Sequence, residues 1–181
     1  MAEYFDVLDS NGNKTGEKKD RKLVHRDGDW HKAVHVWIMN SKGEFLMQKR
    51  SPNKDSHPNE WDISSAGHVV TGDDSMTTVL KEIEEELGLS ASPREIELLF
   101  SCKKQSVLNN GTFINNEFND VYLLKKDLDI STIKLQAEEV SDVRWFTAKE
   151  MESILKNKTP GYVPHPEEYV RLIEYSNKLG S

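Results

Sequence analysis

Three glutamates are clustered on one short stretch of the chain. Glu82, Glu85 and Glu86 follow the spacing i, i+3 and i+4, which puts neighbouring Cβ atoms of a helix about 5–6 Å apart. Like charges at these spacings destabilise a helix by a few tenths of a kcal/mol per pair. A solvated acidic face is one interpretation. The other is a site for Mg²⁺, which prefers hard oxygen ligands and leaves positions for water and substrate phosphates.

The helix that must carry these glutamates is predicted over residues 74–87. Residues 73–75 are good N-caps, and Gly88 is a suitable C-terminal stop. At 100° per residue, an apolar stripe lies on a different face from the glutamates. This stripe consists of Met76, Leu80, Ile83 and Leu87. An extended segment through Gly67 precedes the helix, so the acidic face can meet the end of a sheet.

The other elements alternate between strand and helix patterns. Strands are predicted over residues 3–8, 30–39, 44–50, 95–107, 112–124 and 140–146, with an extended segment at 61–65. A helical turn is predicted over 21–25, and helices over 147–155 and 167–178. Asn109-Asn110-Gly111 is a hairpin turn. Strands on both sides of a central helix predict an α/β fold, a mixed sheet between helices.

Composition excludes several classes of protein. A length of 181 residues predicts one domain. The 24 basic and 31 acidic residues give a net charge of −7, which argues against a nucleic-acid binder. The densest basic stretch, residues 18–22, is interpreted as a solvated turn. Because no apolar run approaches about 18 residues, neither a membrane span nor a signal peptide is expected. A single cysteine, Cys102, is consistent with the cytoplasm; monomer and homodimer both stay open.

The acidic segment resembles the Nudix box, GX5EX7REUXEEXGU, where U is aliphatic. Gly67, the pair Glu82-Ile83, the pair Glu85-Glu86 and the pair Gly88-Leu89 match this pattern in type and spacing. Two positions depart from it: Asp73 stands where the box has Glu, and Lys81 stands where it has Arg. Lysine keeps the charge but loses the bidentate fork of arginine. Residues 1–181 are therefore identified as a single domain of the Nudix superfamily.

This resemblance implies a function and a site. It implies that Glu82, Glu85 and Glu86 bind Mg²⁺ or Mn²⁺, and that the enzyme hydrolyses a diphosphate linkage in a nucleoside diphosphate derivative or a related organic diphosphate. Glu85 is the catalytic candidate within the box. Outside it, Glu117 is a candidate base or further metal ligand, with an exposed hairpin acid as the equally weighted alternative. A non-catalytic nucleotide-binding module is a further alternative.

A narrower resemblance, over roughly residues 3–175, is to the isopentenyl-diphosphate isomerase branch of the superfamily. Its marks include His25, His31, Pro58, the pair Lys49-Arg50, the pairs Trp61-Asp62 and Gly67-His68, and Asn116-Glu117. The isomerase has a proton-transferring cysteine immediately before the Gly-His pair, where this chain has Ala66. Alanine cannot transfer a proton. Hydrolysis is therefore the prediction, and isomerisation is kept as an alternative.

Further substrate contacts are predicted around the box. Arg50, Gly67, His31 and His68 are the candidates, and alternation along a strand allows only one of Lys49 and Arg50 to face the site. The resemblance implies that His25, His31 and His68 bind a metal, but a packed strand histidine is the commoner fate of a residue like His31. His35 is expected to be packed as well, and His165, between two prolines, is expected at the surface.

Overall fold

The computed structural model describes residues 3–179, which form a nine-stranded mixed sheet. Its strands are β1 (Tyr4–Leu8), β2 (Lys14–Asp20), β3 (Trp30–Met39), β4 (Phe45–Arg50), β5 (Trp61–Asp62), β6 (Ser65–His68), β7 (Ile96–Leu108), β8 (Phe113–Lys125) and β9 (Val140–Phe146). β3 is central: it pairs in parallel with β8 and antiparallel with β1, β4 and β6. The order is β2-β1-β3-β4-β5, with β7 paired to β8 and β9 to β4.

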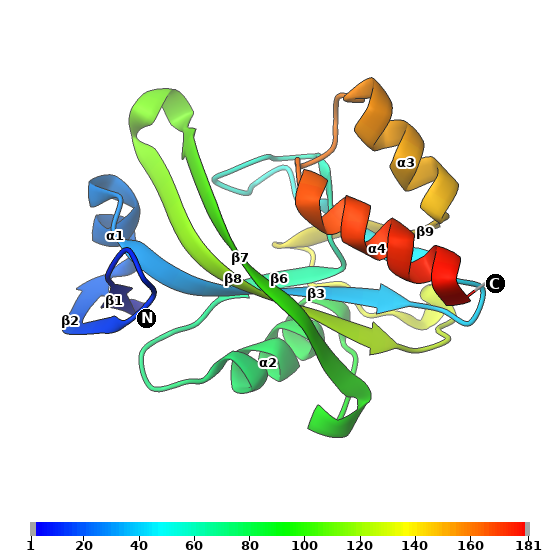
Figure 1. Cartoon of the computed structure of the whole chain (residues 1–181), viewed down its shortest axis with the longest axis horizontal. Helices are drawn as coiled ribbons and strands as arrows, with labels where there is room; N and C mark the ends of the chain where they lie inside the picture. The colour runs from blue at the N-terminus through cyan, green and yellow to red at the C-terminus, as the bar shows by residue number, and fades with distance from the viewer. Residues whose placement is uncertain (1–2, 180–181) are drawn as a thin grey trace.

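Helices cover both faces of this sheet (Figure 1). α2 (Ser75–Leu87) packs on one face, whereas α3 (Ala148–Asn157) and α4 (Pro166–Leu179) lie together on the other. The short α1 (Arg21–Asp27) lies beside β1 and β2, and the β7–β8 hairpin extends beyond the helices (Figure 1). The predicted α/β fold and its helix-covered sheet are confirmed. None of the helices in this range has the length and apolar character needed to cross a membrane.

Alternation along β3 divides the core into two layers. Val34, Val36 and Ile38 are fully buried toward α2, whereas Trp37 and Met39 pack on the side of α3 and α4. The period of two in a strand causes this division. The same alternation places His31 and His35 on one face of β3, the face of Trp37.

The caps of α2 agree with the sequence, but its buried stripe does not coincide with the predicted one. Asp74 accepts a hydrogen bond from the Thr77 amide, and Gly88 ends the helix in the left-handed conformation. The fully buried apolar residues are Val79, Ile83 and Leu87. Met76 and Leu80 are only partly buried, because the helix is turned so that Val79 and the Glu86 side face the sheet.

The basic stretch at residues 18–22 was predicted as a solvated turn, and this prediction is wrong. Lys18 and Lys19 belong to β2, which pairs antiparallel with β1 at the sheet edge. Its pairing depends on backbone hydrogen bonds to β1 rather than on an apolar side-chain pattern, so these residues carry no strand pattern in the sequence. The ammonium of Lys19 lies 2.6 Å from carboxylates of both Asp27 and Asp29.

Candidate metal and catalytic site

A glycine allows the acidic helix to approach the sheet. Gly67 lies in β6, where an added Cβ would be 2.1 Å from Oε1 of Glu82 and 2.5 Å from its Cγ. No real Cβ contact is that short, so a side chain at position 67 would displace the carboxylate. Gly67 was predicted to contact substrate; the structure shows that it makes room for Glu82.

Glu86 is the most buried of the three glutamates, with 5% of its surface exposed. Its Oε2 accepts hydrogen bonds from the Ser65 hydroxyl at 2.6 Å, the Gln48 amide at 3.1 Å and the Ala66 backbone N–H at 3.3 Å. Glu82 is half-buried and Glu85 is exposed. The three carboxylates thus extend from the sheet out to solvent.

Burial and mutual repulsion both disfavour the ionised form of these carboxylates. Burial, together with the charges of Glu86 and Glu85, raises the pKa of Glu82 to about 8. Burial raises the pKa of Glu86 to about 7, although hydrogen bonds from Ser65 and Gln48 oppose the rise. The ammonium of Lys81, one turn before Glu85, binds Asp73 at 2.6 Å. A divalent cation would supply the missing charge.

All three glutamates line a cavity of about 700 Å³. Arg50 and Lys54 also line it. Arg50 donates to Asp62 at 3.1 Å and to the Ser56 carbonyl at 3.0 Å, and Lys54 pairs with Glu139. Arg50 is thus the member of the Lys49-Arg50 pair that faces this side, as strand alternation allowed.

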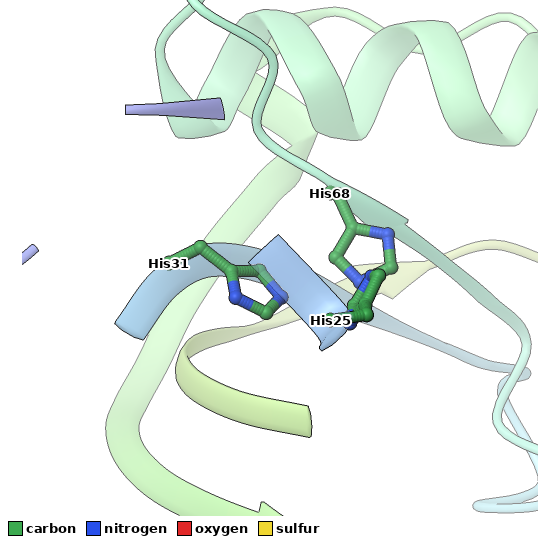
Figure 2. A group of neighbouring side chains, drawn as sticks. All are labelled: His25, His31 and His68. Atoms are coloured by element: carbon green, nitrogen blue, oxygen red, sulfur yellow. The ribbon is translucent and has the colours of Figure 1, made fainter. Parts of the chain in front are cut away.

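Three histidines from three different elements meet beside this cavity, which His68 and the neighbouring Glu117 line. Figure 2 shows the rings of His25 in α1, His31 in β3 and His68 in β6 directed toward one another. One ring nitrogen of each lies within 4.8 Å of the others. Within residues 3–179, Nε2 of His25 and Nε2 of His31 are buried without a hydrogen-bond partner. Unpartnered imidazole nitrogens at this spacing fit a metal ion.

The same burial keeps these imidazoles neutral. It lowers the pKa of both His25 and His31 to about 4, and it also lowers the pKa of His68. Glu117 is buried beside them, with Oε1 3.2 Å from Nε2 of His68 and 3.9 Å from Nε2 of His31. Burial alone would raise the pKa of Glu117, but the hydrogen bond from His68 and the nearby histidines hold it below its usual range. Glu117 is therefore not the exposed hairpin acid of the alternative interpretation.

The expectation that His165 lies at the surface is wrong. His165 is buried, with Nε2 2.8 Å from Asp62 Oδ1 and Nδ1 3.4 Å from Glu168 Oε1. His35, which was expected to be packed, is buried as predicted, and its Nδ1 lies 2.7 Å from the same Glu168 oxygen. Only the packing of α4 against the sheet brings these groups together, and spacing along the chain does not indicate it.

Several residues that support the glutamates were not predicted from the sequence. Gln48 and Ser65 bind Glu86 from β4 and β6. The charge of Lys54 lowers the pKa of both Glu82 and Glu86. Gln48 stands directly before the Lys49-Arg50 pair, and Ser65 stands two positions before Gly67. Proximity to those motifs was the only available signal.

Known proteins share this sequence pattern. A family profile described as "NUDIX domain" matches residues 29–168. The chain is 46% identical over 177 residues to Nudix hydrolase 3 of Arabidopsis thaliana, which covers 95% of this chain but only 23% of that protein. It is 34% identical over 162 residues to an uncharacterized Nudix hydrolase of Clostridium acetobutylicum, covering 88% of this chain and 77% of that one. An isopentenyl-diphosphate Delta-isomerase of Serratia proteamaculans is 28% identical over 123 residues, or 68% of this chain and 66% of that protein.

Solved structures share the fold at low sequence identity. A protein of Deinococcus radiodurans superposes with a TM-score of 0.73 at 20% identity, covering 94% of this chain and 99% of that one. The Nudix domain of NrtR from Shewanella oneidensis, solved with ADP ribose, gives a TM-score of 0.55 at 19% identity, covering 83% and 88% of the two chains. The sequence relatives, the matching profile and the acidic helix packed at Gly67 lead to one conclusion: this chain belongs to the Nudix hydrolase family.

Proposed function

We propose that this protein hydrolyses the diphosphate linkage of a nucleoside diphosphate derivative or a related organic diphosphate with Mg²⁺ or Mn²⁺. The carrying observation is the group of three carboxylates at one cavity wall, two of them with raised pKa values. Carboxylate oxygens are the ligands that these hard cations prefer. A cation held there supplies Lewis acidity to the phosphoryl group.

The side chains divide the remaining work by position. Glu82 and Glu86 hold the cation, and Gly67 leaves the space that Glu82 occupies. Arg50 and Lys54, which line the same cavity, neutralise charge on the diphosphate. Glu85 is exposed at the cavity edge, where it can accept the proton of an attacking water. A new P–O bond forms to that water as the bridging P–O bond breaks, which releases two phosphorylated products.

Glu117 fits a ligand role better than the predicted role of base. Its low pKa makes it a weak proton acceptor, and it lies against His68 and His31. We propose that His25, His31 and His68 hold a second divalent metal with Glu117. Neutral imidazoles suit transition metals such as Mn²⁺ or Zn²⁺. In this role His31 and His68 would reach the substrate only through that ion.

Isomerisation is the alternative, and two positions disfavour it. Ala66 lines the cavity where the isomerase-like pattern has a thiol. Cys102 lies in β7 within the apolar cluster below α4, where burial raises the pKa of its thiol to about 11. Neither side chain supplies the proton transfer that alkene isomerisation needs.

A phosphate-release screen tests the proposed function. Nucleoside di- and triphosphates, dinucleotide polyphosphates, nucleotide sugars and prenyl diphosphates are incubated with the protein and Mg²⁺ or Mn²⁺. We expect metal-dependent turnover of at least one class. Tight binding of a nucleotide with no turnover under any metal would instead support a sensing module. A cytoplasmic location is also proposed, on the basis of the single cysteine.

A further inference from the structure

A buried polar network connects α4 to the cavity wall around Ala66. Oε1 of Glu168 lies 2.7 Å from Nδ1 of His35, and its Oε2 accepts from the Trp37 indole at 2.8 Å. Burial would raise the pKa of Glu168, but His35 and His165 hold it well below its usual value. The carboxylate is thus ionised, so Nδ1 of His35 must be the donor. Glu168 fixes the ring as carboxylates fix the imidazoles of other enzyme sites.

This orientation leaves Nε2 of His35 for another partner. The ring's hydrogen bond within the described range is made by Nδ1, and His35 lines the cavity. In β3, His35 is the direct antiparallel partner of Ala66, so both side chains are on the same face of the sheet. The methyl group of Ala66 adds no polar atom, which leaves the imidazole as the polar group of this pair.

A second polar group, on the neighbouring strand β8, lies on the same face of the sheet as His35. Asn119 in β8 is fully buried, and within residues 3–179 neither Nδ2 nor Oδ1 of its amide has a hydrogen-bond partner. Asn119 pairs in register with Ala33, which lines the cavity two residues before His35. A buried amide without partners costs about 1–3 kcal/mol. Such a group indicates an occupant that the fold itself does not supply.

We propose that His35 and Asn119 form a subsite that binds a hydroxyl group on the organic half of the diphosphate substrate. This inference rests on the proposed function. A hydroxyl both donates and accepts, so it complements the amide of Asn119, which offers one donor group and one acceptor. The hydroxyl also pairs with Nε2 of His35. An apolar chain would leave both groups buried and unsatisfied, which a polar pocket penalises strongly.

The test compares a hydroxyalkyl diphosphate with the alkyl diphosphate of the same chain length, with the hydroxyl placed at each carbon in turn. We expect wild-type kcat/KM to favour the best hydroxyl compound at least about tenfold. His35→Asn keeps an amide near the Nδ1 position but removes Nε2, whereas His35→Gln does the reverse. The ratio of kcat/KM for the hydroxyl compound to kcat/KM for the alkyl compound should fall toward one in H35N and fall less in H35Q.

Asn119→Leu separates recognition from structural support. It removes the unsatisfied amide, so the melting temperature should rise while the preference for the hydroxyl compound falls. A higher melting temperature with an unchanged preference would mean that Asn119 holds only a structural water, and would overturn its assignment. Equal wild-type kcat/KM for all pairs, or a preference for the alkyl compound, would overturn the whole subsite.

A binding experiment distinguishes failure of this subsite from failure of the proposed function. Non-hydrolysable methylene-bridged analogues of the same pair are titrated into wild type and H35N by calorimetry with Mg²⁺. If no diphosphate is hydrolysed but the hydroxyl analogue binds wild type at least tenfold more tightly, the subsite stands and the hydrolase proposal fails. If hydrolysis is robust but the two analogues bind equally, the subsite fails alone.

Discussion

The glutamate cluster on α2 lines the cavity, and the histidine cluster of α1, β3 and β6 reaches it through His68, but the two clusters are built in opposite ways. One helical turn supplies all three glutamates, whereas His25, His31 and His68 come from three separate elements. Burial acts on both, because it disfavours whichever form is charged. It raises the pKa of Glu82 and Glu86 and lowers the pKa of His25 and His31.

The consequence differs between the two clusters. The glutamates repel one another when ionised, so they need a cation to stabilise their charge. The histidines stay neutral and keep lone pairs that no described residue satisfies for His25 and His31. The first cluster therefore suits a hard ion and phosphates, and the second suits a transition metal. If this distinction is correct, substitutions should affect the two clusters separately.

The largest expected effect follows from removing one carboxylate ligand. Glu86→Gln should lower kcat/KM by about 1,000-fold or more, because a Lewis-acid cation contributes several kcal/mol to the transition state. Phosphate release under saturating Mg²⁺ measures this loss. The control is Glu84→Gln, an exposed residue of the same helix, which should keep full activity. Full activity of E86Q would contradict the metal assignment.

A substitution in the histidine cluster should weaken the binding of a transition metal and leave Mg²⁺ at the glutamates in place. His31→Gln should weaken Mn²⁺ or Zn²⁺ binding by at least about 10–100-fold, because even outer-shell changes have effects of this size. Equilibrium dialysis with elemental analysis measures the bound metal. His57→Gln, whose imidazole pairs with Glu60 at 2.8 Å, is the matched control. The two clusters would not be independent if H31Q lost Mg²⁺ at the glutamates to the same extent.

Gly67→Ala should break the packing of the glutamate cluster without removing a ligand. Its Cβ would displace the Glu82 carboxylate, so we expect about a tenfold loss of kcat/KM, or about 1.4 kcal/mol, and a lower melting temperature. In the double variant Gly67→Ala/Glu82→Ala, the clash is gone, so stability should recover while activity stays low. Calorimetry and the phosphate assay follow the two properties. Wild-type activity in G67A would show that Glu82 does not need this position.

A smaller effect concerns pH and stability without metal. The folded pKa values of about 8 for Glu82 and about 7 for Glu86 lie above their unfolded values. Their stabilising contribution is complete below the unfolded pKa and is lost as pH rises through the folded pKa. The metal-free melting temperature should therefore fall by several degrees from pH 6.5 to 8.5. This window lies above the values of about 4 for His25 and His31.

Mg²⁺ and a double variant provide the controls for this pH effect. Added Mg²⁺ should flatten the pH dependence because the cation stabilises both carboxylates. Glu82→Gln/Glu86→Gln should flatten the pH dependence without metal. This variant separates the two glutamates from His165. Burial and Lys104 lower the pKa of His165, but Glu168 and Asp62 outweigh them and raise it. An equally steep profile in that variant would assign the effect to other groups.

The smallest expected effect is the absence of isomerisation. The purified protein with Mg²⁺ should not interconvert isopentenyl and dimethylallyl diphosphates, because Ala66 carries no transferable proton. Cys102→Ala should leave hydrolysis within about twofold of wild type. A labelled-substrate assay checks the first expectation; measurable turnover there would reinstate the isomerase alternative.

The local sequence was sufficient for much of the fold. Asp74 and Gly88 bound α2 as their capping chemistry predicts, and the Asn109-Asn110-Gly111 turn joins β7 and β8. Edge strand β2 was missed because its charged side chains carry no strand pattern. The i, i+3, i+4 spacing was likewise enough to group Glu82, Glu85 and Glu86, since a helix fixes such neighbours by geometry alone.

Tertiary structure alone decided what surrounds those glutamates. Registers between β3, β6 and β8 put Ala66 beside His35 and Asn119 beside Ala33, and the docking of α4 buried His165 against Asp62. These contacts join residues up to 133 positions apart, as His35 and Glu168 are. Side-chain spacing along a chain constrains partners within a few turns, whereas burial and strand register depend on how whole elements pack. The sequence therefore determined the acidic cluster, and packing determined its pKa values and the groups that face it.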